Sequence, residues 1–96
     1  MATFVTLYKY TEQGLKTIKD GPKRLEAAKK AMGSAGLTLK EAFWLQGEYD
    51  FMAIVEGDEI AGTAFNLNIL KQGNLQSHTM RAFTLAEMTK ILERVA

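Results

Sequence analysis

The sequence predicts an α+β fold in which a four-stranded antiparallel sheet carries its helices on one side. Four short stretches rich in β-branched and aromatic residues alternate with helical stretches in the order β-α-β-β-α-β, and one more helix follows. Only Gly47-Glu48-Tyr49-Asp50 separates the two middle strands, as a hairpin corner in which glycine supplies a positive φ. Right-handed crossovers in both halves then give a ferredoxin-like sandwich.

The first half of the chain contains one strand and an interrupted helix. Thr3–Tyr10 is the first predicted strand, and Thr11 is a natural N-cap for the helix after it. Asp20-Gly21-Pro22 must break that helix, because proline has no N–H donor. We expect a short helix, a break, and a longer helix that begins at Pro22 and ends at Gly36 in a left-handed cap.

The second half contributes three strands and two helices. The predicted strands are Leu37–Gln46, Phe51–Glu56 and Leu75–Phe83. The helix between the last two strands should begin after an Asp58 cap and close at Gly73. Thr84 and Glu87 form a capping box ahead of a final amphipathic helix.

One face of the predicted sheet is too apolar for contact with water. In the second strand we expect Leu39 and Phe43 to face the helices, which leaves Trp44 on the opposite face. The residues that we assign to this uncovered face are Tyr8, Trp44, Met52, Ile54 and Met80. An uncovered patch of this kind marks an interface, so we expect a homodimer or a larger assembly.

Bulk composition limits the classes of function. With 96 residues, 47% of them apolar, the chain forms a single domain spanning residues 1–96. The net charge of +1 gives no support for a nucleic-acid or membrane partner. The absence of cysteine excludes disulfides and fits a reducing cytoplasm. Because no leader and no apolar run of about 20 residues occurs, we expect a cytoplasmic protein.

Several local motifs, spread over nearly the whole chain, resemble those of the GYD-domain family. They are Thr11-x-x-Gly14, Pro22-x-Arg24, Gly47-x-Tyr49-Asp50, Gly73-Asn74, and Thr79-Met80-Arg81-Ala82-Phe83 followed by Glu87. The resemblance implies a fold of the dimeric α-β barrel type, a sheet-to-sheet homodimer that is often built into larger rings, and no settled activity. The wider superfamily includes cofactor-free monooxygenases, muconolactone isomerase-like enzymes and heme-handling proteins, which is an analogy of fold alone.

The side chains suited to catalysis or metal binding are few. His78 is the only histidine, and neither a metal-ligand spacing nor a Gly-x-Ser-x-Gly elbow accompanies it. A packed strand histidine is therefore the favoured interpretation, and heme ligation by His78 enters only by analogy. We expect no metal and no cofactor, and the sequence assigns no residue to catalysis.

Arg81 is the charged residue most in need of a partner, because an arginine inside a sheet usually pairs with a carboxylate. We expect Asp50 or Glu48 at the hairpin corner to serve. The hypothesis is that Arg81 and Asp50 form one polar cluster that closes the end of an apolar pocket, with Tyr49 and Thr79 nearby. An ion pair that merely fixes the end of the sheet is the structural alternative.

Two further binding modes receive little support. Lys16, Lys19, Lys23 and Arg24 gather around the helix start at Pro22, where a solvated face is favoured over an anion site. RNA-recognition domains share this order of elements, but the third strand here is acidic at both ends and has one aromatic residue. We therefore expect no RNA binding.

The leading functional hypothesis is a homo-oligomeric small-molecule binding module with an apolar pocket, either between sheet and helices or at the dimer seam. The candidate ligand-binding residues are Tyr8, Trp44, Tyr49, Asp50, His78, Thr79 and Arg81. A cofactor-independent monooxygenase- or isomerase-like enzyme is the first alternative. A purely structural assembly protein is the second.

Overall fold

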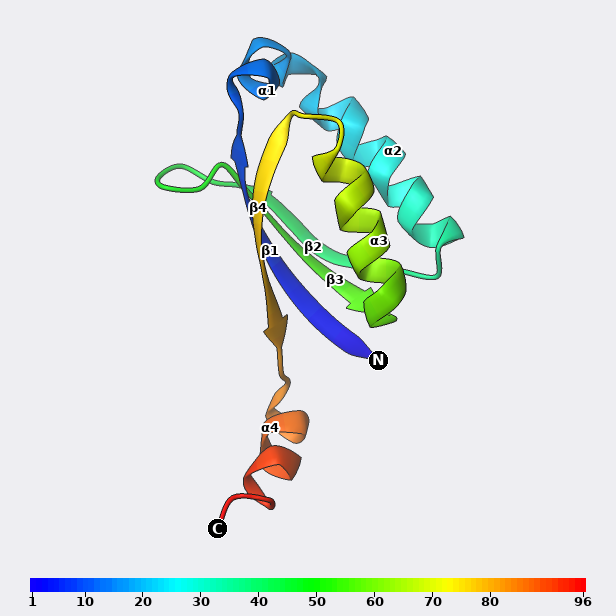
Figure 1. Ribbon diagram of the computed structural model, residues 1–96, viewed down its shortest axis with the longest axis vertical. Helices are drawn as coiled ribbons and strands as arrows, with labels where there is room; N and C mark the ends of the chain where they lie inside the picture. The colour runs from blue at the N-terminus through cyan, green and yellow to red at the C-terminus, as the bar shows by residue number, and fades with distance from the viewer.

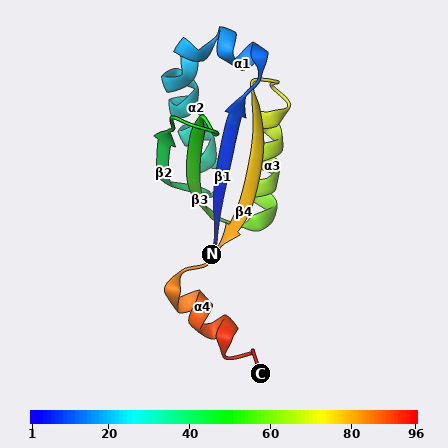
Figure 2. The same cartoon turned by 90° about the vertical axis from the view of Figure 1, so that its left-hand side faces the viewer.

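The computed structural model describes all 96 residues and confirms the ferredoxin-like α+β fold. Its elements are β1 (Ala2–Tyr10), α1 (Glu12–Lys16), the 3₁₀ turn η1 (Ile18–Asp20), α2 (Gly21–Ser34), β2 (Thr38–Trp44), β3 (Phe51–Gly57), α3 (Glu59–Leu70), β4 (Leu75–Ala82) and α4 (Leu85–Leu92). The sheet has the order β2-β3-β1-β4, and every pairing is antiparallel. Helices α2 and α3 cover one face (Figure 1), and the uncovered face is turned toward the viewer in Figure 2.

The predicted helix starts are confirmed by their hydrogen bonds. The side chains of Thr11, Asp58 and Thr84 accept the backbone N–H groups of the residues three positions later. Glu87 completes the capping box by accepting the N–H of Thr84 at 2.9 Å. Pro22 lies in the first turn of α2, where its missing N–H costs no helix bond.

The register of the central strand β1 decides which side chains meet the helices. Tyr8 lies opposite Phe51 on β3 and Ser77 on β4, while its neighbour Leu7 lies opposite Met52 and His78. Tyr8 is buried and donates its hydroxyl hydrogen to Oδ1 of Asn66 on α3, at 3.0 Å. Even-numbered residues of β1 therefore face the helices, and odd-numbered residues face outward.

The assignment of Tyr8 and Trp44 to the uncovered face is therefore wrong, although Met52, Ile54 and Met80 do lie there. Strand β1 is apolar on both faces, so alternation alone could not orient Tyr8. In β2 the pairing shifts between Leu39 and Glu41, and this bulge reverses the alternation. As a result Phe43 shares the outward face with its partner Met52, and Trp44 turns inward with Phe51.

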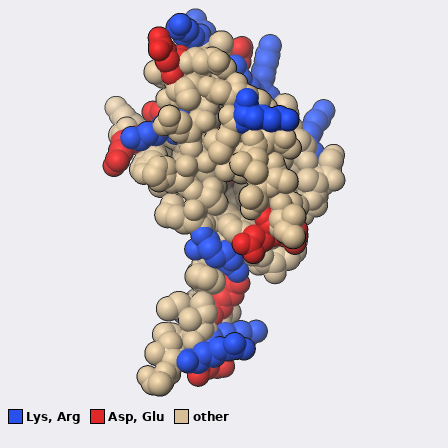
Figure 3. All heavy atoms as spheres, in the orientation of Figure 1, with Lys and Arg blue, Asp and Glu red and all other residues tan.

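Helix α4 projects away from the rest of the domain (Figures 1 and 2). Its apolar residues stay exposed: Leu85, Met88, Ile91 and Leu92, with Val95 just beyond the helix. Figure 3 shows charged side chains on one side of this arm and uncharged atoms on the other. The helix is amphipathic as predicted, but its apolar side covers nothing in its own chain.

Gly47 confirms the predicted hairpin corner, with φ of 137°. A β-carbon there would meet no other atom within 4 Å, so a substitution would act through the backbone conformation. We predict that Gly47→Val lowers the free energy of unfolding by more than about 1 kcal/mol, measured by urea denaturation. Gly33→Ala is the matched control, because Gly33 lies in α2 with equally open surroundings.

The control should raise the free energy of unfolding by about 0.5–1 kcal/mol, since alanine favours the helical state. Equal effects of the two substitutions would mean that the corner does not require a positive φ.

Candidate functional site

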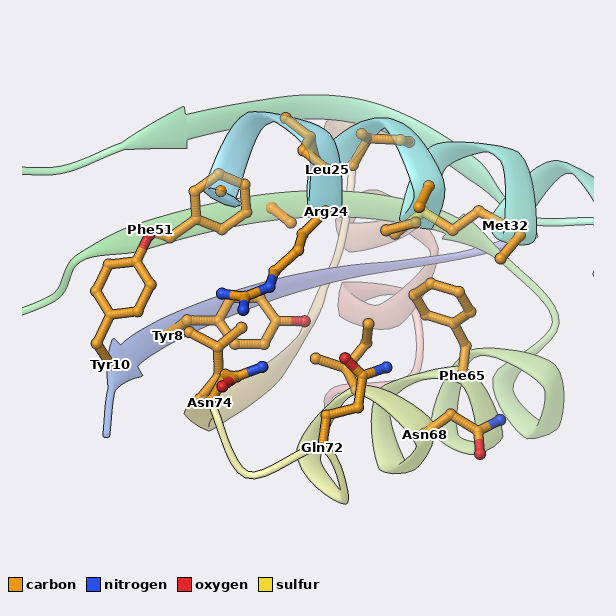
Figure 4. Close-up of a pocket in the computed structure, with 18 of the residues that line it drawn as sticks. Tyr8, Tyr10, Arg24, Leu25, Met32, Phe51, Phe65, Asn68, Gln72 and Asn74 are labelled. Atoms are coloured by element: carbon orange, nitrogen blue, oxygen red, sulfur yellow. The ribbon is translucent and has the colours of Figure 1, made fainter. Parts of the chain in front are cut away.

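A cavity of about 390 Å³ lies between the sheet and the two helices α2 and α3. Fourteen of its nineteen lining residues are apolar. Known ligand pockets span about 300–1,000 Å³ and have mostly apolar walls with a few polar groups. Figure 4 shows side chains from β1, β3, α2, α3 and the turn after α3 pointing into this space.

The sheet side of the cavity is an aromatic wall. Phe51 is its centre: the Trp44 ring packs edge-on against it with centroids 4.9 Å apart, and the Tyr8 ring lies at 6.0 Å. The indole Nε1–H of Trp44 donates to the hydroxyl oxygen of Tyr10 at 3.1 Å. Strand register and one hydrogen bond thus hold three neighbouring rings in place, inclined to the Phe51 ring by 64° for Trp44 and 45° for Tyr8.

The Tyr8 hydroxyl is a neutral donor. Burial raises the pKa of Tyr8 above its ordinary value, because the charged phenolate loses solvation, and the nearby Thr6 side chain opposes this only in part. At neutral pH the group therefore keeps its proton, in keeping with its bond to Asn66. It cannot act as a base in the cavity.

Arg24 of α2 is the only charged residue among those that line the cavity. Polar lining groups on the other side are the carboxamides of Asn68 and Gln72 from the α3 region and of Asn74 from the turn before β4. Figure 4 shows Arg24, Gln72 and Asn74 directed toward the same space. The cavity therefore combines apolar walls with one positive charge.

Three of the seven predicted site residues line a cavity, and four do not. Tyr8 and Trp44 line the main cavity, and Thr79 lines a smaller one of about 120 Å³, where its hydroxyl lies 3.0 Å from that of Thr6. Tyr49, Asp50, His78 and Arg81 line neither cavity. Tyr49 and His78 instead pack edge-on against each other, with centroids 5.7 Å apart.

The predicted cluster of Arg81 with Asp50 is wrong. Asp50 accepts the backbone N–H of Tyr10 at 2.9 Å, at one end of β1, whereas Arg81 lies opposite Phe4 near the other end. Arg81 pairs with Glu87 at 3.3 Å and lies over the Phe83 ring. An ion pair therefore does fix this end of the sheet, as the structural alternative expected. Its partner, however, is Glu87 in the first turn of α4.

Several lining residues were missed in the sequence, and Arg24 is the most important. It shares a helix face with Ala28 and Ala31, at the spacings i+4 and i+7. This spacing relative to two small alanines was the sequence signal that Arg24 faces the cavity. It was obscured because the neighbouring lysines made Arg24 look like one member of a solvated charge cluster.

Together these features define a ferredoxin-like domain with a ligand-sized, largely apolar cavity under its helices. The chain belongs to the GYD domain family, whose model matches residues 4–92. It is 26% identical over 90 residues to the "Glutamine synthetase and cystathionine beta-lyase binding protein" of Thermus thermophilus, covering 92% of this chain and 95% of that protein.

Two crystal structures resemble the fold. One is FFRP-DM1, with a TM-score of 0.57 and 26% identity, covering 86% of this chain and 100% of that one. The other is the hypothetical protein PHS023 of Pyrococcus horikoshii, with a TM-score of 0.57 and 25% identity, covering 88% of this chain and 92% of that one.

Among the helices described here, none combines the length and apolar character of a membrane span.

The raised pKa of Tyr8 makes stability depend on alkaline pH. The folded state holds this proton more tightly than the unfolded chain, whose ordinary value is 10.0. The resulting stabilisation is complete below that value and is lost as pH rises through the folded pKa. We predict that the free energy of unfolding, measured in urea from about pH 8 to 11, falls less steeply for Tyr8→Phe than for the wild type.

Tyr49→Phe is the matched control, since it removes a hydroxyl from the hairpin corner outside both cavities. The free energy of unfolding of this variant should fall with pH as steeply as that of the wild type. If the free energy of unfolding of Tyr8→Phe falls with pH in parallel with that of the wild type, the loss of stability at alkaline pH cannot be assigned to Tyr8.

Proposed function

We propose that this protein is a small-molecule binding module whose ligand occupies the cavity between the sheet and helices α2 and α3. The observation that carries the proposal is the 390 Å³ apolar cavity with its aromatic wall. The space is partly open to solvent, and Trp44 in its wall is 47% exposed, so a ligand can enter it from outside. Trp44, the only tryptophan, belongs to the wall and would report binding.

The enzyme alternative has weaker support. A cofactor-independent oxygenase or isomerase needs a base that removes a proton from its substrate. No Asp, Glu, His or Lys lines the cavity, Tyr8 is held neutral, and His78 lies on the outward face. The residues present are suited to holding a ligand.

Filling the cavity with protein should abolish binding. Ala28 lines it from α2, whereas Ala64 on α3 lies outside it. We predict that the neutral dye Nile red gains fluorescence with the wild type and with Ala64→Phe, and loses most of that gain with Ala28→Phe. An equal signal from all three proteins would place the dye on an exposed apolar surface and contradict the proposal.

We further propose that the module is a homo-oligomer joined through the uncovered face of the sheet. Its apolar residues are Val5, Leu7, Phe43, Met52, Ile54 and Met80. Phe43 is 50% exposed and Met80 47%. Full burial of one large apolar side chain contributes about 1.5–3 kcal/mol, so several of them favour association. The uncovered apolar side of α4 adds to the surface that a second copy would cover.

A charge in the middle of this face should weaken the oligomer. Ile54 lies between Val5 on β1 and Glu41 on β2, and we predict that Ile54→Lys shifts a dimer or larger species toward monomer at micromolar concentration. Light scattering measures the mass. Ile60→Lys on α3 is the matched control, because Ile60 is 80% exposed and lies away from the sheet. A monomeric wild type would rule out this interface.

The name of the Thermus relative favours a second candidate, a protein-binding role. We infer that this chain also binds partner enzymes, since the similarity to that relative extends over 92% of its length. Size-exclusion chromatography with purified glutamine synthetase and with cystathionine β-lyase tests this directly. Co-elution of neither enzyme, together with no dye binding, would leave the structural assembly role.

A further inference from the structure

Arg24 is held in a defined position beside the cavity. Its Nη2 donates to Oγ1 of Thr17 at 2.8 Å and its Nη1 to the Thr17 carbonyl oxygen at 3.3 Å. Thr17, which accepts both bonds, lies between α1 and η1, outside both elements. Figure 4 shows the side chain reaching from α2 into the cavity.

The Arg24 side chain is 37% exposed, so the N–H groups that do not bond to Thr17 are accessible to water or to a ligand. A guanidinium group has five N–H donors, and Thr17 receives two of these bonds. Asp20 lies 4.0 Å from Nη2, too far for a hydrogen bond, and its side chain is 61% exposed. An exposed pair at that distance contributes little, so the positive charge is only weakly compensated.

The polar groups near Arg24 add a second donor. Oδ1 of Asn74 accepts a bond from Nε2 of Gln13 at 3.0 Å, so the Asn74 amide presents its NH₂ group as the free donor. The carboxylates of the chain are all absent from the cavity lining. The Arg24 guanidinium and the Asn74 amide therefore both offer donors to a ligand with negatively charged oxygens.

The number of charges limits the kind of anion. One arginine matches a single negative charge, whereas a doubly charged phosphate would bring a second charge that no lining residue neutralises. A guanidinium group and a carboxylate form two parallel hydrogen bonds, which is a strong and directional contact. Apart from Arg24 and the carboxamides of Asn68, Gln72 and Asn74, the walls are apolar and aromatic.

Resting on the proposed function, we infer that the ligand is an aromatic carboxylate, with its apolar body in contact with the side chains of Tyr8, Trp44 and Phe51 and its carboxylate on Arg24. The aromatic wall supplies affinity through apolar contact, and Arg24 supplies the choice of anionic over neutral ligands. The 37% exposure of the Arg24 side chain limits the cost of removing the two charged groups from water.

Isothermal titration calorimetry with two probes of equal shape tests the inference. We expect the wild type to bind 2-naphthoate at least about tenfold more tightly than the neutral 2-naphthamide, a difference of about 1.4 kcal/mol. Arg24→Gln should remove this preference by weakening the binding of 2-naphthoate. Lys23→Gln is the matched control: it removes the same charge from the neighbouring position, which does not line the cavity, and should keep the preference.

The outcomes separate this inference from the proposed function. Equal affinity of the wild type for both probes would overturn the carboxylate assignment while leaving the binding module intact. Failure of both probes to bind would count against the module itself. The comparison of probes on the wild type remains decisive even where Arg24→Gln does not fold. Loss of the preference in Lys23→Gln as well would assign it to general charge and overturn the role of Arg24.

Discussion

The position of β1 between β3 and β4 is the constraint on which the rest of the structure depends. Its hydrogen bonds to both neighbours place Tyr8 beside Phe51 and Leu7 beside Met52. Because side chains alternate along a strand, this one register sorts the apolar residues of three strands onto two faces. One face becomes the aromatic wall under the helices, and the other becomes an apolar surface that the chain does not cover.

The cavity arises from how α2 is joined and what it carries. Thr17 lies between α1 and η1, and its carbonyl and hydroxyl oxygens hold Arg24. Farther along α2 the lining residues Ala27, Ala28 and Ala31 are small, so space remains over the rings of the sheet. Thr17 thus fixes the position of the one charge beside the cavity, and three short side chains leave the space over the rings.

The opposite end of the sheet has a different organisation. The N–H of Thr84, with help from Arg81, lowers the pKa of the Glu87 carboxyl group, which is therefore ionised when it pairs with Arg81. That contact joins the first turn of α4 to β4 while the apolar side of the helix stays exposed. The domain accordingly separates the cavity under its helices from the apolar surfaces that its own chain leaves exposed.

The order of elements, the caps at Thr11, Asp58 and Thr84, the break at Pro22 and the corner at Gly47 were all determined by the sequence, because each depends on interactions between residues near in the chain. The face taken by Trp44 was not, since one extra residue in β2 reverses it. Nor was the partner of Arg81, or the role of Arg24. These depend on strand register and on the approach of distant segments, which only the tertiary structure decides.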